Sequence, residues 1–372
     1  MGQAPAHRQG EACTLMPDQN PSPRFAYLEL STLFGRDGDE ELTRYFSRLG
    51  FHARETHTPV GPHPAWRSMD MRRGSARIMV TGHRSGSGFY PRVLHSGPYF
   101  SAVAFATRDL VFTLNCAQDA GLNVTGRIEY RRDGSAQSNV EGPGGMTYTF
   151  IQGAGWGADD RQPGTGSLDH IAVVTTNHDH RRVIDAHRVL FGADSWHPMP
   201  LTRLPSGEAM GSGFIHAGDV RITIVWAEGE CRQLTGFRAI GGDGIQHAAL
   251  RVDDTDGGIL AEVDKARGNG IRFRDAPDAY YDYLEKRLDH PIPDLDDLKA
   301  RGILADDDEF TRPEDGPHGI RQIFAAPFGV SERGPFIELI DRSLGGQTFG
   351  GRNILALAES VELTALRAAS RA

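Results

Sequence analysis

The hydrophobic pattern of the chain alternates between short apolar runs, which predict strands, and longer stretches with apolar residues every three or four positions, which predict helices. The stretch EELTRYFSRLGF, for example, places Leu42, Phe46 and Leu49 on one helical face. In the first half of the chain the expected strands are 25–30, 75–83, 101–110 and 148–152, and the expected helices are 40–51 and 111–121.

The second half shows the same alternation. A turn at Ala217-Gly218-Asp219 predicts a hairpin. Gly192 is suited to end the expected helix 181–192, because glycine readily adopts positive φ. Near the end of the chain, Ile354, Leu357 and Val361 fall on one stripe, which predicts an amphipathic helix. The expected strands are 168–175, 213–228 (as a hairpin), 244–254 and 335–342, and the expected helices are 181–192, 257–270 and 353–369.

The two halves resemble each other as internal repeats. The segment LDHIAVVT aligns with FAYLELST, QHAALRVDD with SAVAFATRD, and FIELIDR with TYTFIQG. These alignments pair His170 with Tyr27, His247 with Ala102, and Glu338 with Thr149. The first two positions have nearly the same separation in both halves, whereas the second half carries an excess of residues within 278–320. We therefore predict a duplicated fold.

Length and composition divide the chain into two units. Its 372 residues suffice for about two domains of roughly 100–200 residues each. Residues 1–23 mix polar residues, glycine and proline without periodicity, so we expect a disordered leader. The Gly-rich segment 153–167 is expected to link an N-terminal domain, 24–152, to a C-terminal domain, 168–372.

The composition excludes several classes of protein. The formal net charge is −9, whereas a dedicated nucleic-acid-binding protein needs a basic surface. The sequence has no apolar run of about 18 residues that would span a membrane, and its N-terminus lacks the apolar region of a secretory signal. Three scattered cysteines, Cys13, Cys116 and Cys231, favour neither a disulfide framework nor a zinc site. We therefore expect a cytoplasmic protein.

The repeat differs between the halves at three chemically informative positions. The second half has His170, His247 and Glu338 there, whereas the first half has residues that cannot form a divalent-metal site. Two imidazoles and one carboxylate on one face form the ligand set of mononuclear iron(II) oxygenases, which leaves coordination positions open. Each histidine taken alone is also compatible with a hydrogen-bonded core residue, and Glu338 with an ion pair to an arginine. Their joint agreement with the repeat favours the metal site.

At these residues the chain resembles a known family. The segments LDHIAV, GDGIQHAAL, AYYDYLEKR, DLDDLKARGILADDD, RQIFAAP, GPFIELIDR and FGGRNILALAESVE are similar, in this order, to those of the 4-hydroxyphenylpyruvate dioxygenase family, and equally to its sister enzyme 4-hydroxymandelate synthase. The resemblance covers 168–362 and is weaker over 24–152. It implies an α+β fold of two vicinal-oxygen-chelate domains made of βαβββ modules. The C-terminal half would form an open barrel around Fe(II), capped by the helix 353–369, and the N-terminal domain would hold no metal.

The resemblance also implies a substrate pocket beside the metal. Two glutamines match those near the substrate in the family, two phenylalanines match the pair that clamps its ring, and one asparagine matches the residue at the start of the closing helix. The expected catalytic residues are Gln246, Gln322 and Asn353, and the expected substrate-binding residues are Ser212, Thr223, Val225, Phe324, Phe336 and Ile354.

Two departures from the dioxygenase pattern favour the synthase. Where the dioxygenase has Pro-x-Asn in a pocket strand, this chain has Thr223 and Val225, and the synthase also has threonine followed by an aliphatic residue. Where the dioxygenase has Gly-Asn-Phe at the closing helix, this chain has Arg352-Asn353-Ile354, and the synthase also ends this triplet in isoleucine. Arg352 matches neither pattern and Trp226 adjoins the altered strand, so another aryl or alkyl 2-oxo acid stays open as the substrate.

The sequence thus predicts an iron(II)-dependent oxygenase, expected to be a homodimer, that uses O₂ to decarboxylate a 2-oxo acid. The expected substrate is 4-hydroxyphenylpyruvate, with 4-hydroxymandelate favoured as product over homogentisate. Two other classes share the fold. An extradiol ring-cleaving dioxygenase is disfavoured by RQIF and FGGRN, and a non-catalytic binding protein needs no His-His-Glu set.

Overall fold

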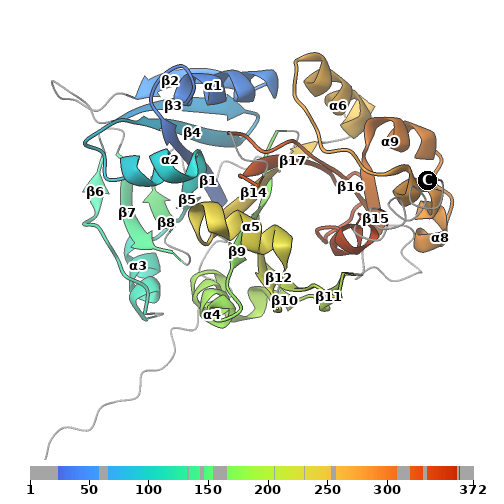
Figure 1. Cartoon of the computed structure of the whole chain (residues 1–372). Helices are drawn as coiled ribbons and strands as arrows, with labels where there is room; N and C mark the ends of the chain where they lie inside the picture. Colours follow the sequence, from blue (N-terminus) through green and yellow to red (C-terminus); the bar gives the residue numbers. More distant parts are fainter. Residues whose placement is uncertain are drawn as a thin grey trace, which may run out of the picture.

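The computed structural model contains two mixed β-sheets with flanking helices, one sheet from each half of the chain (Figure 1). The predicted leader 1–23, most of the predicted linker 153–167 and the end of the predicted C-terminal helix lie outside the described residues. The structure describes residues 24–57, 66–119, 121–131, 134–142, 146–153, 166–204, 206–229, 231–252, 257–307, 319–329, 333–357 and 360.

The first sheet has the strand order β2-β3-β4-β1-β5-β8-β7-β6. Its two central strands, β1 and β5, are antiparallel, and each has a parallel neighbour on its other side, β4 and β8. The elements of this half are β1 (Arg24–Leu33), α1 (Asp39–Arg48), β2 (His52–His57), β3 (Trp66–Arg73), β4 (Ala76–His83), α2 (Tyr90–Ser96), β5 (Tyr99–Ala106), α3 (Leu110–Asp119), β6 (Glu129–Tyr130), β7 (Ala136–Glu141) and β8 (Thr147–Gln152).

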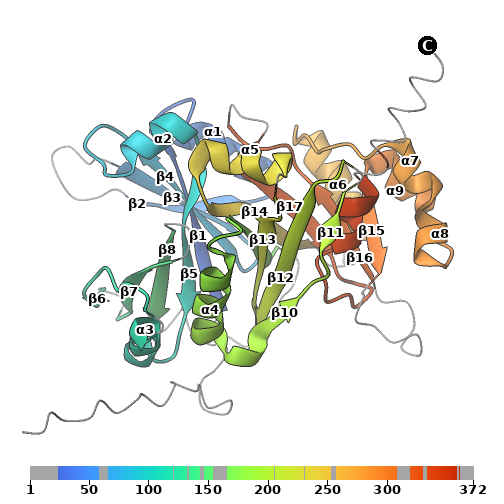
Figure 2. The ribbon, with the colours of Figure 1, turned by 60° about the horizontal axis from the view of Figure 1, so that its bottom comes forward.

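The second sheet repeats this plan in the order β10-β12-β13-β9-β14-β17-β16-β15, with β11 paired to β12. It is curled, and the short helices α7–α9 lie at its outer edge near β15 (Figure 2). Its elements are β9 (Leu168–Thr175), α4 (His180–Phe191), β10 (Trp196–Pro198), β11 (Thr202–Arg203), β12 (Ala209–Ala217), β13 (Val220–Ala227), α5 (Arg232–Gly241), β14 (Gly244–Val252), α6 (Gly258–Gly268), α7 (Asp278–Asp282), α8 (Leu284–Leu288), α9 (Leu295–Arg301), β15 (Leu304–Asp307), β16 (Gly319–Phe324) and β17 (Phe336–Asp341).

The strand register confirms the internal repeat. In the first sheet, Tyr27 and Thr149 both lie opposite Ala104 of β5, from its two sides. In the second sheet, His170 and Glu338 both lie opposite Ala249 of β14. The excess of residues predicted within 278–320 contains the helices α7, α8 and α9, whereas β15 takes the place that β6 has in the first sheet.

Most predicted elements are confirmed, with ends shifted by at most four residues where both ends are described. The hairpin turns at Ala217, which pairs with Val220. The start of the C-terminal helix is also confirmed, since residues 351–357 are helical. The sequence did not predict several strands (β2, β3, β6, β7, β10, β11, β15 and β16) or several helices (α2, α5, α7, α8 and α9).

The two halves share one continuous hydrophobic core, to which both sheets contribute. Helix α3 packs against α4, and the hydroxyl of Tyr148 on β8 lies 2.7 Å from Nε2 of His187 on α4. The other ring nitrogen, Nδ1, lies 2.7 Å from the carbonyl oxygen of Val183. A neutral imidazole that donates from Nδ1 and accepts at Nε2 satisfies both contacts, so His187 links the halves without charge.

This buried histidine makes stability depend on pH. Burial lowers the pKa of His187 to about 4 from the ordinary value of 6.5. Below pH 6.5 the unfolded chain takes up a proton at this position and the folded chain does not, so stability is full above pH 6.5 and falls toward pH 4. We expect His187 to contribute about 2 kcal/mol to the loss at pH 5.

The measurement is the free energy of unfolding by denaturant at pH 7 and pH 5. The variant His187→Gln keeps an acceptor for Tyr148 and cannot titrate, so it should lose less stability between these pH values than the parent. Equal losses in parent and variant would contradict the assignment.

Candidate metal centre

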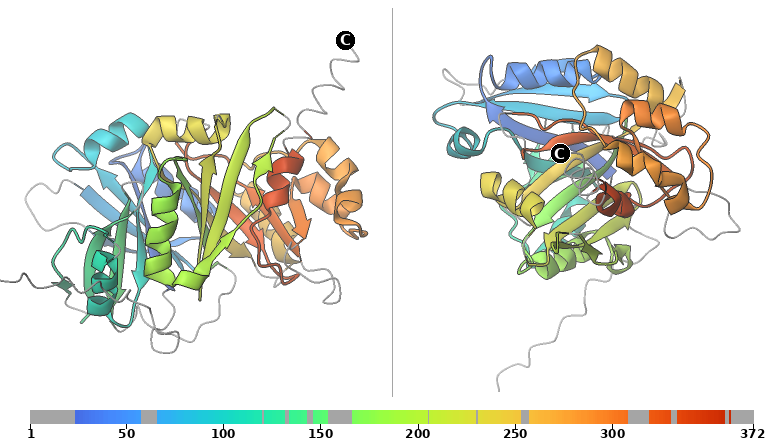
Figure 3. Two further views of the ribbon diagram at one scale, coloured as in Figure 1. Left: turned by 90° about the horizontal axis from the view of Figure 1, so that it is seen from below. Right: turned by 45° about the vertical axis from the view of Figure 1, so that its right-hand side comes forward.

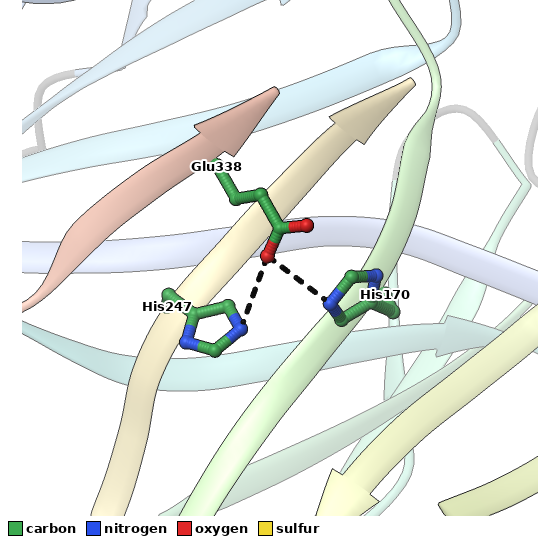
Figure 4. Close-up of side chains that lie close together, drawn as sticks. All are labelled: His170, His247 and Glu338. Carbon is green, nitrogen blue, oxygen red and sulfur yellow. Dashed lines mark ion pairs between the residues drawn. The ribbon is translucent and has the colours of Figure 1, made fainter. Parts of the chain in front are cut away.

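Three neighbouring strands bring the predicted metal ligands together. Figure 4 shows His170 on β9, His247 on β14 and Glu338 on β17 pointing toward one another. Oε2 of Glu338 lies 3.5 Å from Nε2 of His170 and 3.4 Å from Nε2 of His247. The three ligand atoms lie within 4.8 Å of one another. A cation at their centre could therefore be reached by all three.

The surroundings of Glu338 fit a bound cation. The residue is 1% exposed, and its Oε1 has no hydrogen-bond partner among the described residues. An unpaired buried carboxylate is costly, so a positive partner is expected. The alternative of an arginine partner is not seen in the described part of the chain, where the ion pairs of Glu338 are with the two histidines alone. Two imidazoles and a carboxylate suit iron(II).

The two histidines differ in their electrostatic environment. Burial and the nearby His170 and Arg274 hold the pKa of His247 well below its ordinary value. Burial also opposes the charged form of His170, but Glu338 and Asp169 outweigh it and raise the pKa. His247 is therefore available as a neutral ligand, while His170 is held between two carboxylates.

Each ligand histidine follows a residue that bulges out of its strand. The pairing of β9 with β14 shifts at Asp169, and the same pairing shifts at Gln246 on the other strand. A bulge re-aims the side chain it carries. Consequently Asp169 Oδ1 lies 2.9 Å from Nδ1 of His170, and Gln246 Oε1 lies 3.4 Å from Nδ1 of His247.

The ligands form part of the wall of a cavity of about 700 Å³. This volume is within the range of small-molecule sites, roughly 300–1,000 Å³. Eleven of the twelve predicted site residues line this cavity, namely His170, Ser212, Thr223, Val225, Gln246, His247, Gln322, Phe324, Phe336, Glu338 and Ile354. Asn353 is not among its lining residues. Trp226 and Arg352, the two residues that kept another 2-oxo acid possible as the substrate, are not among the lining residues either. The Trp226 ring stacks on the His180 ring, with centroids 4.3 Å apart.

Aromatic rings cover the metal centre. The Phe336 ring stacks on His247 with centroids 4.9 Å apart, and Phe324 meets Phe336 edge-on at 5.8 Å. Sequence reasoning missed Phe349, whose ring lies 4.7 Å from that of His170 and 4.8 Å from Phe214. Phe349 belongs to the FGGRN segment, but it lies in a loop, where no periodicity marks a residue as buried.

Two lining residues offer unused polar atoms. Oγ1 of Thr223 and Oε1 of Gln322 are buried and have no hydrogen-bond partner among the described residues. Gln322 lies against Gly350, where a Cβ would stand only 2.5 Å from Nε2 of the glutamine, and the φ of Gly350 is +67°. Glycine is thus required at 350 for the chain to pass this side chain before it enters the closing segment, the helical residues 351–357. A ligand in the cavity could satisfy both atoms.

Asn353 fastens the closing segment from outside the cavity. Its Oδ1 lies 2.6 Å from the hydroxyl of Tyr280 and 3.1 Å from Nη2 of Arg287. Tyr280 and Arg287 belong to the α7–α8 region, against which the first turns of the C-terminal helix pack (Figure 3). The side chain is fully buried, so this contact latches residues 351–357 to the insertion. The catalytic role predicted for Asn353 stays a prediction.

Removing the latch should loosen this segment. In Tyr280→Phe, Asn353 loses the shorter of its two contacts and the Ala305 amide loses its acceptor. A loss of about 1–3 kcal/mol in the free energy of unfolding is expected, because buried polar groups are left unsatisfied. Hydrogen exchange of residues 351–357 should also become faster.

The neighbouring Tyr281 provides the matched control. Its hydroxyl donates to the Ile303 carbonyl oxygen at 3.1 Å, and no contact to Asn353 is seen. Tyr281→Phe should therefore lower stability without changing exchange at 351–357. An equal change in exchange for both variants would contradict the latch.

The N-terminal sheet lacks such a centre among its described residues. Tyr27, Ala102 and Thr149 occupy the matching positions, and Tyr27 is hydrogen-bonded to Thr149. In the part of the chain that the structure describes, His170, His247 and Glu338 form the single cluster of metal-binding side chains. We therefore expect one metal ion per chain.

None of the helices in the described part of the chain combines the length and apolar character that crossing a bilayer requires.

Comparisons with known proteins agree with this geometry. No protein-family model matches the chain. It is 26% identical over 352 residues to 4-hydroxyphenylpyruvate dioxygenase from Pseudomonas aeruginosa, an alignment that covers 89% of the chain and 91% of the relative. It is 34% identical over 152 residues to 4-hydroxyphenylpyruvate dioxygenase from Legionella pneumophila, an alignment that covers 40% of each chain.

Two solved structures extend the comparison to the fold. A triple mutant of 4-hydroxymandelate synthase from Streptomyces coelicolor matches with a TM-score of 0.76 and 25% identity, covering 92% of this chain and 99% of that one. A fusion protein of a xylose isomerase-like TIM barrel and 4-hydroxyphenylpyruvate dioxygenase matches with a TM-score of 0.68 and 20% identity, covering 92% of this chain and 53% of that one. The chain is therefore a homologue of 4-hydroxyphenylpyruvate dioxygenase and 4-hydroxymandelate synthase, with their two-domain vicinal-oxygen-chelate fold.

Proposed function

We propose that this protein is an iron(II)-dependent oxygenase that decarboxylates 4-hydroxyphenylpyruvate oxidatively and forms 4-hydroxymandelate. The observation that carries the proposal is the buried His170–His247–Glu338 cluster in the wall of a cavity large enough for an aryl 2-oxo acid. The relatives named as dioxygenases support the reaction class. The synthase-like Val225 and Ile354 in the cavity wall support the benzylic product.

The metal ligands would set the charge of the site. Two neutral imidazoles and one carboxylate carry a single negative charge, so a divalent ion held by His170, His247 and Glu338 would leave a net positive charge at the cavity wall. Such a charge attracts the carboxylate of a 2-oxo acid. When bound, iron(II) supplies the activation of O₂ that the side chains cannot provide themselves.

The reaction balances without a second oxo acid. 4-Hydroxyphenylpyruvate and O₂ give 4-hydroxymandelate and CO₂. The bond between the carboxylate and the carbonyl carbon breaks, and the carbonyl carbon becomes the new carboxylate. One oxygen atom of O₂ enters that carboxylate, and the other becomes the benzylic hydroxyl. The substrate therefore supplies both the two electrons of its decarboxylation and the two of its benzylic C–H bond.

The chain's own residues would position the substrate. Phe324 and Phe336 offer perpendicular ring faces beside His247, which suits an aromatic ring held near the metal. The Oε1 of Gln322 can accept a hydrogen bond from the substrate, and the hydroxyl of Thr223 can donate one. The remaining wall is mostly apolar, which excludes water from the reacting groups.

The test is product identification. The protein is loaded with iron(II) without oxygen, then mixed with 4-hydroxyphenylpyruvate and O₂, and the products are separated by chromatography, because 4-hydroxymandelate and homogentisate have the same mass. The proposal predicts 4-hydroxymandelate and one CO₂ per turnover. Homogentisate would assign the dioxygenase reaction instead, and CO₂ release only from another 2-oxo acid would reassign the substrate.

A further inference from the structure

A buried ion pair stands directly behind one metal ligand. Arg342 donates to Asp169 through Nε and Nη2, with both distances 2.8 Å, and Asp169 Oδ1 lies 2.9 Å from Nδ1 of His170. The three residues are 4%, 2% and 1% exposed. Arg221 adds a second, longer contact to Asp169 at 3.6 Å. The carboxylate therefore accepts a hydrogen bond from the Nδ1–H group and leaves Nε2 of His170 to face the metal position.

The same arginine also holds the loop that covers this histidine. Nη1 of Arg342 donates to the carbonyl oxygens of Gly346 and Thr348, at 2.9 Å and 2.7 Å. The next residue is Phe349, whose ring packs on His170 at 4.7 Å and lies under the Arg342 guanidinium at 5.3 Å. One guanidinium thus fixes both the hydrogen-bond partner of His170 and the ring that covers it.

The fold alone does not require this carboxylate. The N-terminal sheet has the same bulge, since the pairing of β1 with β5 shifts at Ala26, one residue before Tyr27. The bulge therefore belongs to the repeat, and only the second half places a charged residue on it. The difference follows the metal ligands, because Tyr27 stands where the second half has His170.

We propose that the Asp169–Arg342 pair is the positioning unit of the metal centre, in which Asp169 orients His170 toward the cation and Arg342 fixes Asp169 together with the Phe349 loop. The proposal rests on the proposed function in so far as His170 must bind a metal ion. Neither residue touches the substrate position, so each acts through His170. Loss of a hydrogen-bond partner of this kind lowers metal affinity by about 10- to 100-fold in comparable sites.

The test measures metal binding rather than turnover. The full-length, metal-free protein is titrated with Co(II) without oxygen, and its visible absorption gives the dissociation constant and the ligand geometry. Asp169→Asn should weaken binding about 10- to 100-fold and change the spectrum. Arg342→Lys, which keeps the charge but loses the planar fork, should weaken it less and should speed hydrogen exchange of residues 346–349.

A matched control separates positioning from general stability. Asp70 is equally buried and is held by Arg72 and Arg77 in the N-terminal sheet. Asp70→Asn should lower the melting temperature but change Co(II) affinity by less than about twofold, because Asp70 and its arginine partners belong to the first sheet and the metal ligands to the second. If both variants weaken binding in proportion to their loss of stability, the positioning role is overturned.

Two further outcomes are decisive. If Asp169→Asn fails to fold, the double variant Asp169→Asn/Arg342→Met is used instead. It removes both charges of the pair, a replacement that proteins often tolerate. The same loss of Co(II) affinity is expected for it. If either variant keeps the Co(II) affinity and the absorption spectrum of the unmodified protein, the positioning role is overturned and the proposed function is unaffected. If the unmodified protein binds no Co(II), or if His170→Ala binds Co(II) as tightly as the unmodified protein, both the proposed function and the positioning role are contradicted.

Discussion

Replacing His170 with alanine is expected to abolish iron(II) binding and CO₂ release together. The side chain is buried on β9, and its Nε2 lies 3.5 Å from the carboxylate oxygen of Glu338 that also faces His247. Without this imidazole, His247 and Glu338 remain as ligands, and the third coordination position has no side chain to fill it. A strand-borne ligand set cannot close such a gap, because the backbone positions are fixed by the sheet.

The measurement is iron content after gel filtration, followed by CO₂ release on addition of 4-hydroxyphenylpyruvate and O₂. The unmodified protein should retain one iron per chain. His178→Ala is the control, because its side chain is 95% exposed near the start of α4 and its loss should change neither quantity. Full activity in His170→Ala would exclude this residue as a ligand.

The internal repeat explains why the ligands could be predicted from sequence. His170 and Glu338 are each the third residue of a strand of strongly apolar character, and each strand has a counterpart in the first half. Because side chains alternate along a strand, aligning the strands also aligns the faces. The register at Ala249 shows that this alignment holds in space.

The bulges explain what the repeat pattern did not predict. Strict alternation would turn Asp169 and Gln246 away from the histidines that follow them. The shifts in the pairing of β9 with β14 re-aim both side chains, and nothing in their sequence neighbourhood marks a bulge. Asp169 was therefore missed entirely, and Gln246 was noted only through the family resemblance.

Long-range contacts explain the remaining differences. Oδ1 of Asn353 contacts Tyr280 and Arg287, which are far from it in sequence and could not be predicted as its partners; its catalytic role stays a prediction. Strands β2 and β3 were missed because charged residues interrupt their apolar pattern, as in HARETH and WRSMDMRR. Their pairing to the sheet edge comes from tertiary structure, which local periodicity does not encode.

The second large effect concerns the carbon that is oxidised. The ring carbon that bears the side chain and the benzylic carbon are directly bonded, so a small tilt of the ring decides which of them faces the oxidant. Val225 and Ile354 both line the cavity, from β13 and from the helix at 351–357. An asparagine and a phenylalanine there would add a polar contact and an aromatic wall.

We therefore expect the unmodified enzyme to form mainly 4-hydroxymandelate and the double variant Val225→Asn/Ile354→Phe to shift the products toward ring oxidation. A difference of about 1.4 kcal/mol between the two barriers changes the product ratio tenfold. One packing or polar contact has about this magnitude, so a tenfold shift is the expected size. Chromatography of the isomeric products measures it.

The position of the added ring can be tested separately from its bulk. Leu357 also lines the cavity, one helical turn after Ile354. Val225→Asn/Leu357→Phe adds a similar volume at a different place, and it should leave benzylic oxidation dominant. Equal shifts in both double variants would mean that crowding alone controls the product. Homogentisate as the main product of the unmodified enzyme would show that Val225 and Ile354 do not turn the ring toward benzylic oxidation, although the metal ligands and the reaction class would be unaffected.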